Sequence, residues 1–186
     1  MKKVMYFAVC EAARVYEEDG FDAMIADGRN TFLMAGGNSD IVSCWCKCYE
    51  RFKDQPKKIV NDLRNSSVKD ACEAIYSYMI ANTYYKLDAD GEQLIKSPGR
   101  FLKDHCGDCK SYTMFICSCL HCLGIKHIAR FVNFDGGKQY THVYPVAIDE
   151  NGREIVMDAC ELNEQGVPYY DYARPYMAKK DITYVR

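Results

Sequence analysis

The stretch from His105 to Gly124, HCGDCKSYTMFICSCLHCLG, holds five of the chain's eleven cysteines and decides the predicted fold. Six apolar residues in it recur at helical spacing, namely Tyr112, Phe115, Ile116, Cys119, Leu120 and Leu123. Gly107 and Asp108 predict a tight turn and a helix cap, and Gly124 predicts the end of the helix. Cys109 is therefore predicted to lie in the first turn of a helix.

After this helix the hydrophobic period changes to two, which predicts β-strands. Three apolar segments show it: IKHIARFVNF (125–134), QYTHVYPVAI (139–148) and REIVMDAC (153–160). DGGK and DENG, which separate them, are typical turn sequences. The chain is therefore predicted to have an α+β fold, with N-terminal helices followed by an antiparallel sheet.

Helical patterns dominate the part of the chain before this stretch. Residues 2–18 are predicted to form a first helix and not an export signal. Glu11 stands where the small-residue cleavage site of such a signal would lie. Cys44, Cys46 and Cys48 alternate within 41–52, which leaves strand and helix equally open there. Further helices are predicted near 56–63, 68–82 and 100–105, with a loop from Tyr84-Tyr85 to Gly99, and DITYVR at 181–186 predicts an edge strand.

The length of 186 residues is enough for one domain, 1–186, with its own core. Within it we distinguish a helical N-terminal extension (1–65) without an assigned role, a core (66–160) and a C-terminal strand or tail (161–186). The tyrosine-rich segment of that tail, PYYDYARPY (168–176), is expected to cover a sheet face rather than to line a substrate cleft.

Composition excludes several classes of function. A net charge of −2 gives no electrostatic case for binding nucleic acid or a membrane surface. No apolar run approaches the ~20 residues that cross a bilayer. The number of cysteines, eleven, is odd, so they cannot all pair within the chain. Because no export signal is predicted, free thiols in a reducing compartment and a cytoplasmic location are expected. No cofactor or metal is predicted, and the oligomeric state stays open.

Three residues of this region can meet in space. A helix N-terminus favours the thiolate form of Cys109, which is the nucleophilic form. His142 and Asp158 lie on the two strands that flank the DENG turn. A loop with an odd number of residues, for which Asn151-Gly152 is suitable, puts these two side chains on the same face of the hairpin. We therefore expect an imidazole–carboxylate contact next to the thiol.

These segments resemble the core of the transglutaminase-like superfamily, which has a papain-like cysteine-peptidase fold. The resemblance covers about residues 66–160 and rests on GDCKSYTMFICSCLHCLGI, THVYPVAI and IVMDAC. The preceding GEQLIKSPGRFLKDHCGDC is similar to the smaller microbial and phage-associated members. The resemblance implies acyl transfer through a thioester, with Cys109 as nucleophile, His142 as base and Asp158 as the residue that orients the imidazole.

The expected reaction is hydrolysis of a peptide or isopeptide bond, so the expected partner is a peptide or protein amide substrate. Transamidation, in which an amine replaces water, stays open. The backbone N–H of Cys109 is one natural oxyanion donor. The resemblance implies a second donor from an upstream side chain, and both Gln93 and Tyr85 are candidates.

Three other functions compete with this prediction. A zinc module would use the pairs Cys106–Cys109 and Cys119–Cys122, but a helix between them holds the pairs roughly 15 Å apart at ~1.5 Å per residue. A redox pair of Cys106 and Cys109 leaves His142 without a role. A catalytically silent binding module would keep the fold without a reactive thiol. Cysteines 44, 46 and 48, and histidines 105, 121 and 127, are expected to be packing, surface or satisfied residues.

Overall fold

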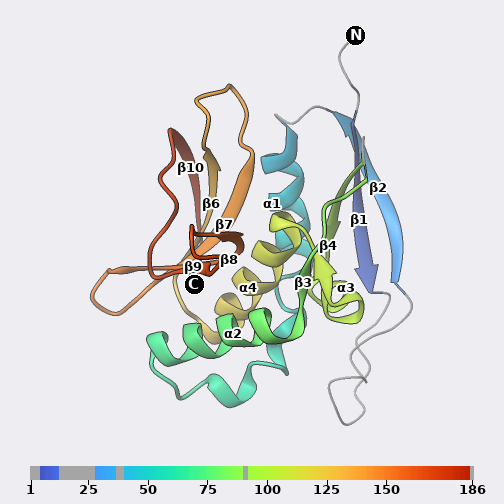
Figure 1. The fold of residues 1–186 in the computed structure, drawn as a ribbon. Helices are drawn as coiled ribbons and strands as arrows, with labels where there is room; N and C mark the ends of the chain where they lie inside the picture. Colours follow the sequence, from blue (N-terminus) through green and yellow to red (C-terminus); the bar gives the residue numbers. More distant parts are fainter. Residues whose placement is uncertain (1–4, 13–27, 37–39, 90–91, 185–186) are drawn as a thin grey trace.

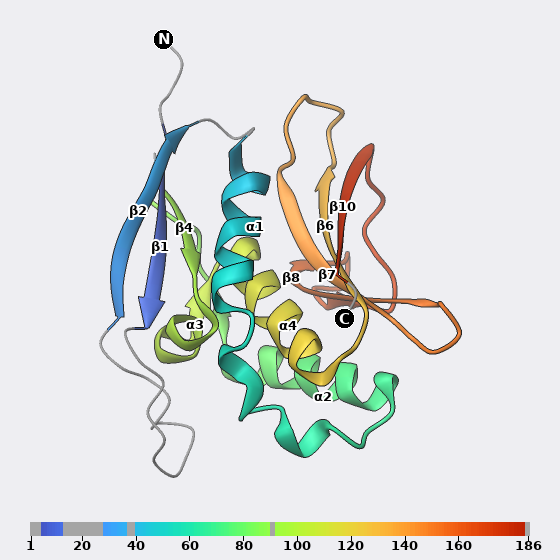
Figure 2. The ribbon, with the colours of Figure 1, turned by 180° about the vertical axis from the view of Figure 1, so that it is seen from behind.

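The computed structural model describes residues 5–12, 28–36, 40–89 and 92–184 (Figure 1). Among these residues there is no helix whose length and hydropathy would let it cross a membrane. The fold combines two larger sheets with a central group of helices, and α1 and α4 lie between the sheets in both views (Figures 1 and 2). The chain thus has the α+β architecture that its hydrophobic periods predict.

The first sheet has the order β2-β1-β4, and the second has the order β10-β6-β7-β8-β9. The first consists of β1 (Met5–Ala12), β2 (Gly28–Gly36) and β4 (Glu92–Lys96). The second consists of β6 (His127–Asn133), β7 (His142–Ile148), β8 (Glu154–Leu162), β9 (Pro168–Tyr170) and β10 (Ala178–Tyr184). All pairings in the second sheet are antiparallel, which confirms the predicted meander and the predicted edge strand at the C-terminus. A small third sheet pairs β3 (Tyr84–Tyr85) with β5 (Cys106–Gly107).

The helix predicted from the opening stretch is α4 (Cys109–Leu123), and it lies at the centre of the molecule. The other helices are α1 (Ile41–Phe52), α2 (Val68–Asn82) and α3 (Pro98–Asp104), with short 3₁₀ helices η3 (Gln55–Lys57) and η4 (Asn61–Leu63). Met114 and Cys117 of α4 pack with α1, while Phe115 and Leu120 pack with α2 and α3. Apolar side chains thus lie on more than one face of α4, since the helix is buried on both sides.

The prediction of a helix over residues 2–18 is wrong, because Met5–Ala12 forms strand β1. Residues 2–4 and 13–18 lie outside the described residues. A short continuous apolar run has no period that separates a buried strand from a helix, so its partners decide. β1 pairs antiparallel with β2 and parallel with β4, which lies within the predicted core. The described part of residues 1–65 is therefore not a purely helical extension, since its strands β1 and β2 share a sheet with β4 of the core.

The predicted loop after Tyr84-Tyr85 also needs correction, because it contains strand β4. β4 forms by pairing with β1, more than eighty residues earlier in the chain, and local sequence does not reveal such a partner. The open choice for 41–52 is settled as helix α1, with Cys44 and Cys48 buried and Cys46 partly buried. Ala173 and Tyr176 pack on the outer face of the second sheet, so part of the tyrosine-rich segment covers a sheet face.

His127 is buried and has a hydrogen-bond partner at each ring nitrogen. Nδ1 lies 2.7 Å from the carbonyl oxygen of Ile125, and Nε2 lies 2.7 Å from the hydroxyl of Tyr49. The carbonyl can only accept, so Nδ1 carries the proton and Nε2 accepts from the tyrosine. Burial lowers the pKa of His127 to about 4. This histidine is thus a neutral, satisfied core residue.

Candidate active site

Cys109 is the first residue of α4, and its surroundings fix the start of that helix. Asp108 is the N-cap, and its Oδ1 accepts hydrogen bonds from the backbone N–H groups of Lys110 (3.1 Å) and Ser111 (3.4 Å). A Cβ atom at Gly107 would lie 2.7 Å from the Cβ of Ser111, so the turn needs glycine. Cys109 itself is partly exposed, and the helix dipole favours negative charge at its sulfur.

The hairpin of β7 and β8 brings His142 and Asp158 together. The N–H of Asp149 donates to the carbonyl of Arg153 (3.0 Å), which leaves three residues in the turn. The last of them, Gly152, has a φ of +79°, as expected for a type I turn with a glycine bulge. The odd count places the two side chains on one face, and Nε2 of His142 lies 2.8 Å from Oδ2 of Asp158. The contact expected from the parity of the hairpin is therefore present.

Asp158 lies where β8 leaves β7 and pairs with β9. The β7–β8 register runs only from Val146↔Val156 to Ile148↔Glu154, and Asp158 pairs with Tyr169 of β9. Its second oxygen, Oδ1, accepts from the backbone N–H groups of Cys160 (3.1 Å) and Glu161 (3.3 Å). With 1% of its surface exposed, the carboxylate is held in one orientation toward the imidazole.

His142 lies between this carboxylate and the thiol. Burial by itself would lower the pKa of His142, but hydrogen bonds to Asp158 and Cys109 and the charges of both raise it to about 10. Because Nε2 is bonded to Asp158, Nδ1 is the nitrogen that can reach the sulfur. The ring is therefore an imidazolium at neutral pH, which is the partner that a thiolate needs.

A cleft of about 250 Å³ opens over Cys109 and His142. Its walls come from α1, β3 and the segment after it, β4, the start of α4 and the β6–β7 region. The lining residues are Ile41, Tyr85, Leu87, Gln93, Asp108, Cys109, Lys110, Phe131, Tyr140, Thr141, His142 and Val143. Both oxyanion candidates, Tyr85 and Gln93, are thus in this cleft. Burial and the neighbouring Cys109 sulfur raise the pKa of Tyr85, so it is a neutral phenol, and its oxygen is hydrogen-bonded to the backbone of Cys109.

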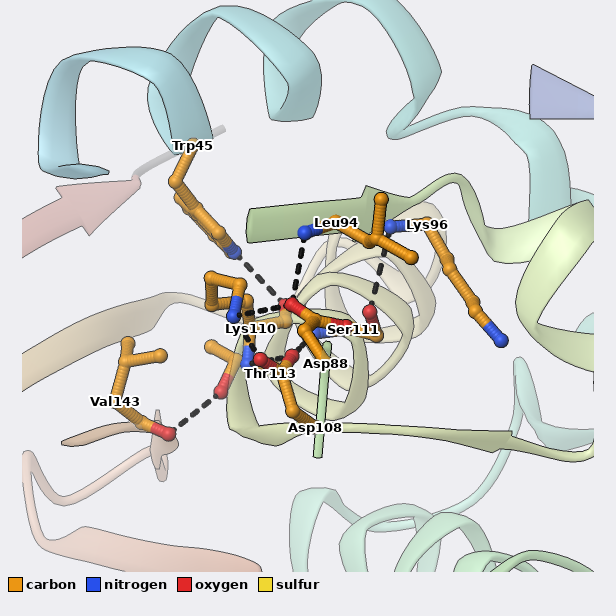
Figure 3. A network of polar contacts seen from close by, with 9 residues as sticks. All are labelled: Trp45, Asp88, Leu94, Lys96, Asp108, Lys110, Ser111, Thr113 and Val143. Carbon is orange, nitrogen blue, oxygen red and sulfur yellow. Dashed lines mark hydrogen bonds and ion pairs between the residues drawn. The ribbon is translucent and has the colours of Figure 1, made fainter. Parts of the chain in front are cut away.

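A buried ion cluster next to Cys109 is not apparent from the sequence (Figure 3). Nζ of Lys110 contacts the carboxylate of Asp108 and lies 3.0 Å from Oδ2 of Asp88. Asp88 also accepts from the N–H of Leu94 (2.8 Å), and Trp45 donates to the carbonyl of Lys110 (3.0 Å). Lys110 thereby joins α4, α1 and the start of β4, although burial lowers its pKa. No spacing signal connects Asp88 with Lys110 in the sequence.

The other cysteines of the opening stretch do not converge. Cys106 precedes α4, whereas Cys119 and Cys122 lie in its last turns. The ten cysteines from Cys44 to Cys160, all within the described ranges, are free thiols. Those ranges also contain no group of three or more histidine, cysteine or acidic side chains arranged to hold a metal ion. This geometry gives no support to the four-cysteine zinc alternative.

The sequence matches no family model and no curated protein. Among solved structures, calcium-bound LapG from Legionella pneumophila is similar with a TM-score of 0.50 and 18% identity, covering 77% of this chain and 83% of LapG. A proposed protease from Parabacteroides distasonis gives a TM-score of 0.53 at 9% identity, covering 79% of this chain and 31% of that protein. A proposed cysteine protease from Cytophaga hutchinsonii gives 0.46 at 13% identity, covering 72% and 51%.

At these identities the likeness establishes the fold alone. The matches to LapG and to the Parabacteroides protein, with TM-scores of 0.50 and 0.53, confirm the predicted papain-like α+β class with its antiparallel sheet. The chain thus shares the fold of a proposed protease. It spans about half the length of the Cytophaga protein (51%) and less of the Parabacteroides protein (31%).

Proposed function

We propose that this chain is a cysteine-dependent acyl-transfer enzyme that hydrolyses a peptide or isopeptide bond through a thioester. The observation that carries the proposal is the buried 2.8 Å hydrogen bond between Nε2 of His142 and Oδ2 of Asp158, on an imidazole that is also hydrogen-bonded to Cys109. A nucleophile, a base and an orienting carboxylate in this order form the arrangement that cysteine hydrolases use. The fold shared with a proposed protease supports the same class of reaction.

In the proposed reaction the thiolate of Cys109 attacks the carbonyl carbon of the amide. The carbonyl oxygen becomes an oxyanion, and the imidazolium of His142 gives its proton to the departing amine as the C–N bond breaks. The neutral imidazole then takes a proton from water, which attacks the thioester. Breaking the C–S bond releases the carboxylic acid and returns Cys109 to thiolate and His142 to imidazolium, while Asp158 keeps the ring in place throughout.

The lining of the cleft indicates an uncharged substrate segment. Cys109 and His142 are the reacting groups, and the other ionisable side chains in the lining are four: Asp108, Lys110 and the phenols of Tyr85 and Tyr140. Asp108 and Lys110 are paired with each other, so neither offers a free charge to a ligand. The remaining walls are largely aliphatic and aromatic, with Leu87 73% exposed at the rim. We therefore propose that the acyl segment carries apolar rather than acidic or basic side chains.

The proposal is tested by mass spectrometry after limited treatment with iodoacetamide at pH 6. We expect one adduct, on Cys109, formed much faster than on any other thiol, and hydrolysis of a fluorogenic peptide-amide library that stops in Cys109→Ala. Adding a primary amine then tells hydrolysis from transamidation by the mass of the product. Slow and uniform labelling of all thiols, with no turnover, would favour a silent binding module and reject the enzyme.

Tyr85→Phe is expected to lower kcat by about 10²-fold with little change in KM. The reason is that the Tyr85 hydroxyl lies at the backbone N–H of Cys109, where the oxyanion forms, and one such donor is worth roughly 10²–10³ in rate. The measurement is steady-state hydrolysis of the best peptide amide. Tyr84→Phe, in which an exposed neighbour loses its hydroxyl, serves as control. A large loss in Gln93→Leu with an unchanged Tyr85→Phe would assign the donor to Gln93 instead.

A further inference from the structure

A buried hydrogen bond from a side chain to the backbone joins the helix of the nucleophile to the strand of the histidine. The Thr113 hydroxyl in α4 donates to the carbonyl oxygen of Val143 in β7 at 3.0 Å (Figure 3). Thr113 is fully buried and follows Cys109 by one helical turn. Val143 is buried and directly follows His142. The two residues that form this hydrogen bond are therefore close in sequence to Cys109 and His142.

This use of the hydroxyl is not the local one. A threonine inside a helix commonly donates to the carbonyl four residues earlier, which here belongs to Cys109. In this chain the hydroxyl reaches across to another element instead. It does so where β7 has separated from β8, since the ladder between them begins at Val146↔Val156. Thr113 thus supplies a directional contact to a part of β7 that β8 does not hold.

Val143 also makes apolar contacts with α4. Val143 packs with Met114 and Cys117 of α4 in one buried cluster. Apolar packing of this kind is nondirectional, so it resists separation better than sliding. A hydrogen bond also requires a particular donor position and angle. The hydroxyl of Thr113 therefore restrains how far β7 can slide along α4.

We propose that Thr113 is a positioning residue that sets the gap between the Cys109 sulfur and the His142 ring by fixing β7 against α4. The inference rests on the proposed function, because the gap matters only if these two groups react together. A displacement of about 1 Å between reacting groups can cost roughly 10²-fold in rate. The loss from removing one restraint is expected to be smaller, about tenfold.

The test compares Thr113→Val, which keeps the shape and removes the hydroxyl, with Thr113→Ser, which keeps the hydroxyl. Ser118→Ala is the matched control, since the Ser118 hydroxyl is buried in the same helix and has no hydrogen-bond partner among the residues that the structure describes. The readout is the rate of Cys109 alkylation by iodoacetamide from pH 5 to 9, which needs no substrate. Thermal unfolding identifies folded variants, and Thr113→Ala replaces Thr113→Val if the latter does not fold.

We expect Thr113→Val to lower the alkylation rate at pH 6 by about tenfold, and Thr113→Ser and Ser118→Ala to match the unmodified protein. An unchanged Thr113→Val, in a protein whose labelling is fast and slowed by His142→Ala, would overturn the positioning role alone. Equal losses in Thr113→Val and Thr113→Ser would also overturn it, because packing would then explain them. Slow labelling of the unmodified protein that His142→Ala leaves unchanged would overturn the proposed function as well.

Discussion

His142→Ala is expected to lower kcat/KM for a peptide amide by about 10³-fold, or roughly 4 kcal/mol of transition-state stabilisation. The variant loses both the imidazolium next to Cys109 and the group that protonates the departing amine. Asp158→Asn should lose less, since its amide oxygen can still accept the hydrogen bond from Nε2 that Asp158 accepts at 2.8 Å. The measurement is steady-state hydrolysis of the best substrate from the fluorogenic library.

The pH dependence of Cys109 alkylation separates this role from a structural one. Because hydrogen bonds to Asp158 and Cys109 outweigh burial and raise the pKa of His142 to about 10, the imidazolium persists from acid pH up to that range. Labelling of the unmodified protein should therefore be fast already at pH 6. The alanine variant should be about 10²-fold slower there, as an ordinary thiol is, and should approach the unmodified rate above pH 8.

His105→Asn is the control for the histidine variant. His105 is exposed and has a φ of +51°, a conformation that asparagine tolerates. We expect it to label and turn over as the unmodified protein does. If His142→Ala kept the fast labelling at pH 6, the imidazole would have no part in activating the thiol.

The sequence predicts those parts of the site that depend on local rules. A cap and an apolar stripe are sufficient to start α4 at Cys109. The parity of a short hairpin is sufficient to place His142 and Asp158 on one face, because side chains alternate along strands. Each of these rules relates residues within one helix or one hairpin, so no knowledge of distant partners is needed.

What the sequence does not predict depends on pairings between distant segments. The short apolar run of β1 fits both a helix and a strand, and only its pairing with β2 and β4 decides between them. The contact of Lys110 with Asp88 joins a helix to the segment before β4, across twenty-two residues that include α3. A charged residue beside the nucleophile suggests a solvated surface by composition alone, yet Lys110 is only 5% exposed.

Lys110→Met is expected to lower the free energy of unfolding by about 3–5 kcal/mol. Lys110 is buried against the carboxylates of Asp88 and Asp108, whose side chains are 11% and 5% exposed. Removing the ammonium leaves two acidic groups in contact with little solvent, and breaking a buried ion pair by removing one partner has a cost of this size. Urea denaturation measures the change, and Lys69→Met on the exposed face of α2 is the control, expected within about 0.5 kcal/mol.

A double variant shows whether the cost comes from uncompensated charge or from lost packing. Replacing a whole buried ion pair by apolar groups of similar volume is often nearly neutral. Lys110→Met combined with Asp88→Leu should therefore be more stable than the sum of the two single variants, by roughly 1–3 kcal/mol of coupling. Recovery should be incomplete, since Asp88 also accepts the N–H of Leu94 at 2.8 Å, a bond that leucine cannot replace. Additive losses in the double variant would mean that Lys110 acts through its packing and not through its charge. If Lys110→Met alone were within about 1 kcal/mol of the unmodified protein, the ion cluster would not hold β4 to the helix of Cys109.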